Sequence, residues 1–289
     1  MNHSRILLYL ILLFCSLSCL AEEVNTTAQG PIEERIKKEE QIPANYFSIT
    51  LYKPTYILPY YYTFSPYNSI YQNNTPNNEK LKNEEFKYQL SFKVPVWQDI
   101  FDHPSSLFLA YSQLSYWQVY NNKAFFRETD YEPELFLANE LKWHLSPNWR
   151  LSFLNVGVSH QSNGYGNTLE RSWNRLYVDA IISTDNWMIS IKPWYILSTY
   201  ENNENIGHFL GYGNLLVSYK LHQQVFSLRM YNVIESAGKR GGAELSWSFP
   251  ITPYIKGYLQ AFSGYGQSLI EYNHRTNSLG IGIALNDWV

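Results

Sequence analysis

The sequence predicts an all-β protein, a twelve-stranded antiparallel transmembrane β-barrel. Three observations predict it: an N-terminus typical of exported proteins, an excess of aromatic residues without a long apolar run, and a regular alternation of apolar and polar residues. The alternation has a period of two, which is the period of a β-strand with one dry and one wet face. Such strands close into a barrel when the dry face meets lipid and the wet face lines the interior.

The first 21 residues have the pattern of a secretory signal peptide. Residues 1–5 carry positive charge, residues 6–14 are apolar, and mostly small residues follow up to Ala21. The apolar run is too short to span a bilayer as a helix. We expect cleavage after Ala21, which removes both cysteines, Cys15 and Cys19, so the mature chain would contain no disulfide. The alternative is a lipoprotein anchor on Cys19, which the register of the preceding residues disfavours.

Residues 22–45 are expected to form a periplasmic N-terminal extension, and residues 46–289 are expected to form the barrel. The run at residues 33–40 is charged at every position except Ile36. A segment of that composition buries little apolar surface, so we expect it to be loosely ordered.

The composition of the chain fits a barrel but does not single it out. The chain has 25 Tyr, 9 Trp and 15 Phe among 289 residues, yet its mean hydropathy is −0.32. In a transmembrane barrel the two strand faces average out, and aromatic residues form girdles at both interfaces. A secreted β-sandwich or a lectin-like domain rich in tyrosine would have a similar composition. The net charge of −3 and the absence of a basic cluster give no indication of nucleic-acid binding.

Alternation along the segments favours the barrel over the sandwich. In residues 243–249 every apolar residue has an odd number and every polar residue an even one. Residues 86–94 and 279–285 repeat the alternation. Between residues 129 and 142 the odd face is largely apolar, and the even face carries five charged residues, interrupted by Phe136 and Ala138. Charges of both signs opposite an apolar face are typical of strands that line a polar barrel interior.

The connections between the expected strands alternate in length. Short turns are expected at residues 146–148, 184–186, 222–224 and 250–253, and longer polar connections at residues 66–83, 163–170, 200–207, 233–239 and 267–277. Tight turns at one end and longer loops at the other are the arrangement of outer-membrane barrels. We expect the last strand, residues 279–289, to close the sheet against the first strand, residues 56–64.

One pair of neighbouring strands carries candidate catalytic residues on its apolar face. The even-numbered face of the first strand ends in His160 and Ser162, and the same face of the return strand begins with Asn174. Residues two apart on one strand face are neighbours, and a hairpin partner brings Asn174 beside the imidazole. A serine hydroxyl is a weak nucleophile until a base removes its proton, and the base needs an orienting acceptor on its other nitrogen. The three residues form a candidate triad on the lipid-facing wall.

The alternative is that these residues are the polar rim of strands that leave the membrane. A lone His-x-Ser tripeptide arises often by chance. Two features favour catalysis: all three residues continue apolar rows in phase, and Gly164 follows in a loop that can offer backbone N–H groups to an oxyanion.

From about residue 85 to the end, the sequence resembles the outer-membrane phospholipase A family. The landmarks that carry the resemblance are residues 126–133 (FRETDYEP), 160–164 (HQSNG), 171–177 (RSWNRLY), 192–195 (KPWY), 241–245 (GGAEL) and 263–266 (SGYG). The resemblance implies a twelve-stranded barrel in the outer membrane of a Gram-negative bacterium, with its active site toward the outer leaflet. It also implies a calcium-dependent hydrolase of phospholipid and lysophospholipid acyl esters that is active as a homodimer.

The resemblance assigns roles to individual residues. Ser162 would be the nucleophile, His160 the general base and then acid, and Asn174 the orienting residue. The backbone N–H of Gly164 would supply the oxyanion hole, assisted by calcium-bound water.

A calcium site is implied by the same resemblance, with departures from the family pattern. Its ligands would be the carbonyl oxygen of Tyr165 and the side chain of Glu170, which stands where the family has a serine. A carboxylate is a better ligand than a hydroxyl for a hard cation, although Glu170 could equally be a solvated loop charge. The third ligand would come from the partner subunit's loop at residues 120–125, where Asn122 is the candidate and the family's serine is missing. Gln113, on the outward face, resembles the family's dimer-interface glutamine, because a polar residue facing lipid needs a partner.

Two other functions remain as alternatives. A structural or passive-transport barrel would have inert rim residues, but it has no reason to place a histidine and a serine on its lipid face. A barrel protease would place acidic pairs in the loops or inside the rim, whereas Glu132 and Glu134 are expected to point inward and lie far from His160 in sequence. No spacing of histidine and acidic residues indicates a zinc site.

Overall fold

The computed structural model describes residues 30, 32, 35, 48–100 and 105–289. The expected signal peptide, both cysteines and most of the expected extension at residues 22–45 lie outside the described residues. Of that extension, Ile32 is buried against Met188 and Leu216. The Arg35 guanidinium donates hydrogen bonds to the carbonyl oxygens of Tyr52 and Trp288, at 2.7 and 3.3 Å.

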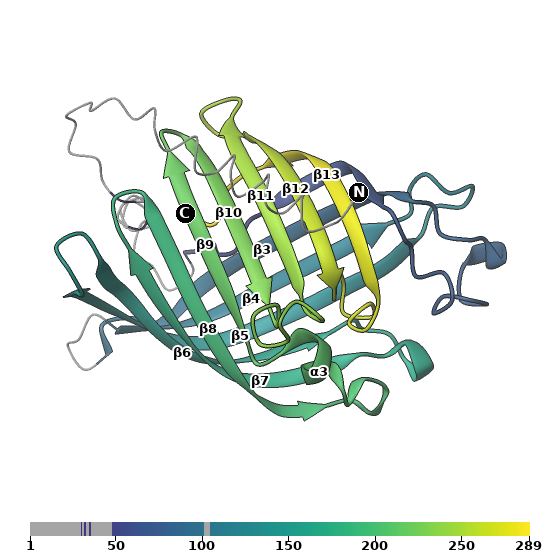
Figure 1. Ribbon diagram of the computed structural model, residues 1–289, viewed down its shortest axis with the longest axis horizontal. Helices are drawn as coiled ribbons and strands as arrows, with labels where there is room; N and C mark the ends of the chain where they lie inside the picture. Colours follow the sequence, from purple (N-terminus) through teal and green to yellow (C-terminus); the bar gives the residue numbers. More distant parts are fainter. Residues whose placement is uncertain (1–29, 31, 33–34, 36–47, 101–104) are drawn as a thin grey trace.

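Twelve antiparallel strands, β2 to β13, form a closed barrel (Figure 1). Each strand pairs with the next in the sequence, and β13 closes the sheet by pairing with β2. A two-residue strand, β1 (Thr50–Leu51), is added at β3. The strands are β2 (Tyr56–Thr63), β3 (Glu84–Trp97), β4 (Ser105–Trp117), β5 (Phe126–His144), β6 (Arg150–Ser162), β7 (Ser172–Ser183), β8 (Trp187–Thr199), β9 (Gly213–Leu221), β10 (Gln224–Tyr231), β11 (Gly242–Pro250), β12 (Lys256–Tyr265) and β13 (Arg275–Ala284). The predicted fold and the closure between the last and first strands are confirmed.

The bounds predicted for the last strand were wrong. We expected residues 279–289, whereas β13 spans Arg275–Ala284. The polar side chains after Ala284 explain the early end: Asn286 accepts a hydrogen bond from the backbone N–H of Thr55, and Asp287 forms an ion pair with Lys256. The last residues therefore leave the sheet to satisfy side-chain contacts.

The predicted division of the strand faces is also confirmed. Along β11 the even positions Glu244, Ser246 and Ser248 are buried in the interior, whereas the odd positions are only partly covered. On β13 the apolar residues Leu279 and Ile281 are more than half exposed on the outer wall. The outer wall is therefore the apolar one.

The two ends of the barrel differ as the loop lengths predicted. Few residues connect β5 to β6, β7 to β8, β9 to β10 and β11 to β12. The connections at the other end are longer and contain η2 (Pro76–Asn78), η4 (Asn167–Leu169), η5 (Glu201–Asn203) and α3 (Ile206–Leu210). Among the described residues, no helix is long and apolar enough to cross a membrane.

A β-bulge at the start of β5 turns a charged residue away from the apolar wall. Tyr116 pairs with Glu128 and Trp117 with Phe126, so Arg127 is the extra residue of β5. Counting back by twos from the exposed Leu135, strict alternation would place Arg127 on the outer face. Because a bulge breaks the alternation, Arg127 and Glu128 are both buried instead.

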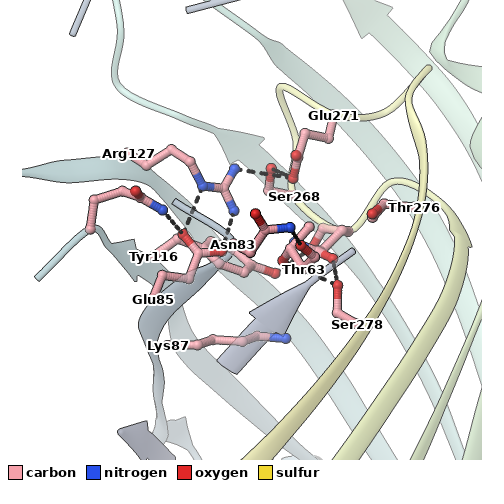
Figure 2. A network of polar contacts seen from close by, with 12 residues as sticks. Thr63, Asn83, Glu85, Lys87, Tyr116, Arg127, Ser268, Glu271, Thr276 and Ser278 are labelled. Carbon is pink, nitrogen blue, oxygen red and sulfur yellow. Dashed lines mark hydrogen bonds and ion pairs between the residues drawn. The ribbon is translucent and has the colours of Figure 1, made fainter. Parts of the chain in front are cut away.

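Ion pairs fill the barrel mouth on the side of the long loops (Figure 2). Arg127 binds Glu85 through two nitrogens, each at 2.9 Å, and its third nitrogen lies 3.1 Å from Glu271. Glu271 belongs to the connection between β12 and β13, which folds back into the mouth. A buried guanidinium needs partners on all sides, so this loop is held inside the barrel.

A second network of charges lines the interior on the opposite side of the wall from the candidate triad. Glu132 and Glu134 both lie 2.6 Å from the Lys53 ammonium, Arg175 reaches Glu132, and Lys192 reaches Glu134. Both glutamates point inward, as the sequence predicted. The ion pairs neutralise both carboxylates, which lie on the inner face of the wall, whereas His160 lies on its outer face.

Candidate active site

The candidate triad lies on the outer wall, where β6 and β7 approach the long loops. His160 is directly opposite Asn174 in the strand register, and Ser162 is opposite Ser172. The same face continues toward the other end of the barrel with exposed apolar residues, among them Val158 and Leu176. The polar groups therefore end two apolar rows.

The imidazole of His160 is held by Asn174. Nδ1 of His160 lies 2.9 Å from Oδ1 of Asn174. Because an amide oxygen only accepts, Nδ1 carries the hydrogen and donates it, which leaves Nε2 as an acceptor. Among the described residues, no hydrogen bond joins the Ser162 hydroxyl to His160, although the two side chains are neighbours on one strand face. In unliganded enzymes such bonds are often long and tighten only when substrate binds.

The amide of Asn174 has a second partner that sequence reasoning missed. Its Nδ2 donates a hydrogen bond of 2.8 Å to the Ser198 hydroxyl on β8. The register between β7 and β8 shifts here, because Asn174 pairs with Ser198 and Arg175 with Ile196. The shift brings Ser198 next to Asn174, and a register shift of this kind has no signal in a single sequence.

The inner face of the same two strands is tightly packed. The indole N–H of Trp173 donates to Gln161 at 2.8 Å, and the Arg175 guanidinium stacks over the Trp173 ring at 4.2 Å. Arg175 also pairs with Glu132 at 2.6 Å. These contacts hold β6 and β7 together directly behind His160 and Asn174, which is how a rigid element positions reactive groups.

Gly164 follows the candidate nucleophile at a position that other residues would strain. Its φ of +66° is in the left-handed region, and a Cβ atom there would lie 2.9 Å from the ring of Tyr131. Tyr131 is the residue of β5 that pairs with Ser162. A glycine is therefore needed for the chain to turn back over β5 right after Ser162.

The loop from residue 163 to residue 171 is closed by the side chain of Asn163. Its Oδ1 accepts hydrogen bonds from the backbone N–H groups of Arg171 (2.9 Å) and Tyr165 (3.4 Å), and its Nδ2 donates to the carbonyl oxygen of Leu169 (2.9 Å). The Tyr165 hydroxyl donates to the carbonyl oxygen of Arg127 at 2.8 Å. Burial raises the pKa of Tyr165 to about 12, so this hydroxyl remains a donor at neutral pH.

The residues predicted to bind calcium lie in this loop and in a neighbouring one. Glu170 is half-buried beside Tyr200, and its negative charge raises the pKa of the Tyr200 hydroxyl. Asn122 makes a 3.5 Å hydrogen bond to Glu79 of its own chain. No group of three or more His, Cys, Asp or Glu side chains in the described part of the chain is arranged as a metal site.

The donor chemistry of this loop fits calcium, which prefers oxygen ligands and takes six to eight of them. One chain offers the Tyr165 carbonyl and the Glu170 carboxylate. That set is incomplete, so further ligands would have to come from water or from a second molecule.

Gln113 lies on the outer wall and already has three partners in its own chain. Its Oε1 accepts from the Tyr111 hydroxyl at 3.0 Å, and its Nε2 donates to Tyr88 at 3.3 Å and to Ser115 at 3.2 Å. These contacts satisfy the amide on an otherwise apolar surface.

Comparison with known proteins shows similarity along most of the chain. A family model described as Phospholipase A1 matches residues 32–285. The Phospholipase A1 of Klebsiella pneumoniae is 40% identical over 212 residues, which cover 72% of this chain and 73% of that protein. The Phospholipase A1 of Proteus vulgaris is 36% identical over 278 residues, which cover 94% of this chain and 93% of that protein.

Two solved structures share the fold. The outer membrane phospholipase A from Escherichia coli superposes with a TM-score of 0.82 at 35% identity, covering 88% of this chain and 98% of that one. The Salmonella typhi outer membrane phospholipase dimer with bound calcium superposes with a TM-score of 0.81 at 34% identity, covering 87% of this chain and 97% of that one.

Proposed function

Since the chain belongs to the phospholipase A1 family, we propose that it hydrolyses acyl esters of phospholipids and lysophospholipids through Ser162, His160 and Asn174. Membership makes it a carboxylic ester hydrolase of the outer membrane of a Gram-negative bacterium. The observation that carries the assignment of residues is the 2.9 Å contact between His160 and Asn174 on the apolar outer wall.

In the proposed reaction, Nε2 of His160 takes the proton of the Ser162 hydroxyl while Oγ attacks the ester carbonyl carbon. The Gly164 N–H donates to the oxyanion of the tetrahedral intermediate. His160 then protonates the leaving glycerol oxygen as the C–O bond breaks. Water, deprotonated by His160, hydrolyses the acyl-serine and releases the fatty acid. Throughout, the oxygen of Asn174 accepts the hydrogen of Nδ1 and keeps the imidazole in the productive tautomer.

We further propose that the enzyme requires calcium, held by the Tyr165 carbonyl and Glu170, with Asn122 of the partner subunit as a third ligand. Bound calcium would supply positive charge close to the oxyanion. The incomplete ligand set of one chain supports activation by homodimerisation. For Asn122 to take part, it would have to exchange its contact with Glu79. The outward Gln113 supports the same wall as the dimer interface, and the long loops beside the triad support an active site toward the outer leaflet.

The test is fatty-acid release from phospholipid in mixed detergent micelles. Wild type, Ser162→Ala and the control Ser105→Ala are each assayed with calcium and with excess chelator. Ser105 is a matched control because its hydroxyl bonds Asn139 near the opposite end of the barrel. We expect wild type and Ser105→Ala to be active only with calcium and Ser162→Ala to be inactive.

Folding of each variant is checked by its heat-modifiable mobility in gels. Activity of Ser162→Ala equal to wild type, or none in either protein, would favour a passive barrel. Wild-type activity in chelator would leave the triad in place and overturn the calcium site.

A further inference from the structure

We propose that Glu128 is a positioning residue that acts on the active site from inside the barrel. Its carboxylate holds the side chain of Asn163 and thereby fixes the turn that follows Ser162. The proposal rests on the proposed function of Ser162 and Gly164. It adds a group that touches neither substrate nor the reacting atoms.

The contact crosses the wall behind the candidate nucleophile. Nδ2 of Asn163 lies 3.3 Å from Oε1 of Glu128, and the backbone N–H of Ile270 donates to the same oxygen at 3.0 Å. Glu128 is completely buried and Asn163 is 4% exposed. At such a site water does not compete for the hydrogen bonds, and a misdirected polar group is costly.

A carboxylate at this position determines which way the Asn163 amide faces. An asparagine has a donating and an accepting end of nearly equal size, whereas Oε1 of Glu128, to which the Ile270 N–H already donates, is an acceptor. Glu128 therefore selects the rotamer in which Nδ2 faces the barrel interior. Oδ1 is then left to accept from the backbone N–H groups of Tyr165 and Arg171. The reversed amide would place oxygen against oxygen and an NH₂ group against two N–H donors.

The orientation of Asn163 matters for the chemistry because of its place in the chain. Asn163 stands between the proposed nucleophile, Ser162, and the proposed oxyanion donor, Gly164. An oxyanion donor must lie about 2.7–3.1 Å from the developing charge, and a displacement of about 1 Å can cost about 100-fold in rate. Fixing Asn163 therefore fixes both groups relative to each other.

The second contact of Glu128 connects the loop at residues 163–171, the active-site loop, to a distant part of the chain. Ile270 belongs to the connection between β12 and β13, the loop that Figure 2 shows reaching Arg127 through Glu271. Ile270 also packs with Leu169 of the active-site loop in one apolar cluster. The β12–β13 loop thus packs against the active-site loop from inside the barrel, and Glu128 is a polar contact that the two loops share.

The test compares two replacements of equal length at one position. Glu128→Gln keeps an acceptor for Asn163 and Ile270, whereas Glu128→Met keeps the volume and removes it. We expect Glu128→Met to lower kcat about 10- to 100-fold with KM little changed, because the outer wall is untouched. Glu128→Gln should restore most of the rate. The rate at which an alkylsulfonyl fluoride modifies Ser162 is a second readout, and it should fall in parallel with kcat.

Glu134→Met is the matched control. Glu134 is buried on the same strand and face, but its partners are Lys53 and Lys192 rather than the active-site loop. We expect this variant to lose stability, measured by its unfolding midpoint, while the folded fraction keeps the wild-type kcat. A loss of kcat in Glu134→Met as large as in Glu128→Met would overturn the proposal, because any buried carboxylate would then have the same effect.

A double-mutant cycle tests whether Glu128 acts through Asn163. Asn163→Ala should lower kcat at least as much as Glu128→Met, because it also loses the bonds that close the loop, and adding Glu128→Met to it should lower kcat little further. Additive losses overturn the proposal, as does a wild-type rate in Asn163→Ala, which stays informative even if Glu128→Met fails to fold. If Ser162→Ala is inactive but Glu128→Met and Asn163→Ala are not impaired, only this inference fails. If Ser162→Ala remains active, the proposed function fails.

Discussion

Asn174 occupies the position in the candidate triad where a carboxylate is more common. Its two ends are both used, since the oxygen faces His160 and the NH₂ group faces Ser198. An amide can hold the ring and its tautomer but adds no negative charge to stabilise an imidazolium. On an apolar outer wall this has an advantage, because a neutral group costs less to remove from water than a carboxylate.

We predict that Asn174→Ala lowers kcat by about 100-fold, clearly less than His160→Ala. The alanine variant loses the orienting acceptor but keeps the base, whereas His160→Ala loses the base itself. The measurement is single-turnover acyl transfer from a chromogenic ester at saturating calcium. Equal losses in the two variants would mean that Asn174 does more than orient the ring.

Glu170 gives a prediction about the metal. Glu170→Gln should raise the calcium concentration for half-maximal activity on the order of tenfold, because a charged oxygen ligand is lost. The same change should lower the pKa of Tyr200 toward its usual value, because the negative charge that raises it is gone. Calorimetric titration with calcium and absorbance titration of the phenol measure the two effects. If the phenol responds but calcium binding does not, Glu170 is a solvated loop charge.

At the scale of the strands, closure of the barrel requires a glycine at one position where β13 lies against β2. Where β13 meets β2 the register shifts between Ile281 and Ile283. A Cβ atom on Gly282, the residue between them, would lie 2.0 Å from the carbonyl oxygen of Ile57. The first and last strands therefore approach more closely here than two substituted strands could.

We predict that Gly282→Val costs at least about 2 kcal/mol of unfolding free energy, because the added atoms meet backbone that cannot move without breaking the β2–β13 pairing. Denaturant unfolding of the refolded barrel in detergent measures the change. Gly166→Ala is the control, since a Cβ there meets nothing within 4 Å. A Gly282→Val barrel as stable as wild type would show that the two strands can separate locally without cost.

At the scale of the whole molecule, the outer wall around β3 to β7 departs from a simple lipid-facing surface. It carries Gln113 with its three partners as well as the His160–Asn174 pair. These polar groups already have partners in their own chain, as polar groups facing lipid require. A second copy of the barrel seated there would remove from lipid the polar surface that stays exposed.

We predict that Gln113→Ala weakens dimerisation about three- to thirtyfold, the range expected when one side-chain hydrogen bond between two membrane-spanning segments is lost. Chemical cross-linking with calcium, across a range of protein-to-detergent ratios, measures the dimer fraction. Gln224→Ala is the control, because that glutamine also bonds an aromatic partner, Trp247, but on β10. An unchanged dimer fraction in Gln113→Ala would place the interface elsewhere.

The sequence by itself determined the fold class, the faces of the strands, and which connections are short and which are long. It also singled out the three residues of the candidate triad. These features are local: which face a residue occupies follows from the period of two, and His160, Ser162 and Asn174 could be found because they interrupt apolar rows in phase. Catalytic roles for them came from side-chain chemistry and from a family resemblance. The prediction was wrong at the end of β13, where side-chain contacts rather than strand periodicity decide where the strand ends.

Only the tertiary structure decided where the strand register shifts and which loops contact each other. The bulge that turns Arg127 inward, the register shift that brings Ser198 to Asn174, and the two loops that share Glu128 all join positions far apart in the chain. Such pairings depend on the register of every neighbouring strand and on how loops fill the barrel mouth. Side-chain period and residue type do not locate a bulge or a register shift, because these are fixed by packing of the whole barrel rather than by any one segment.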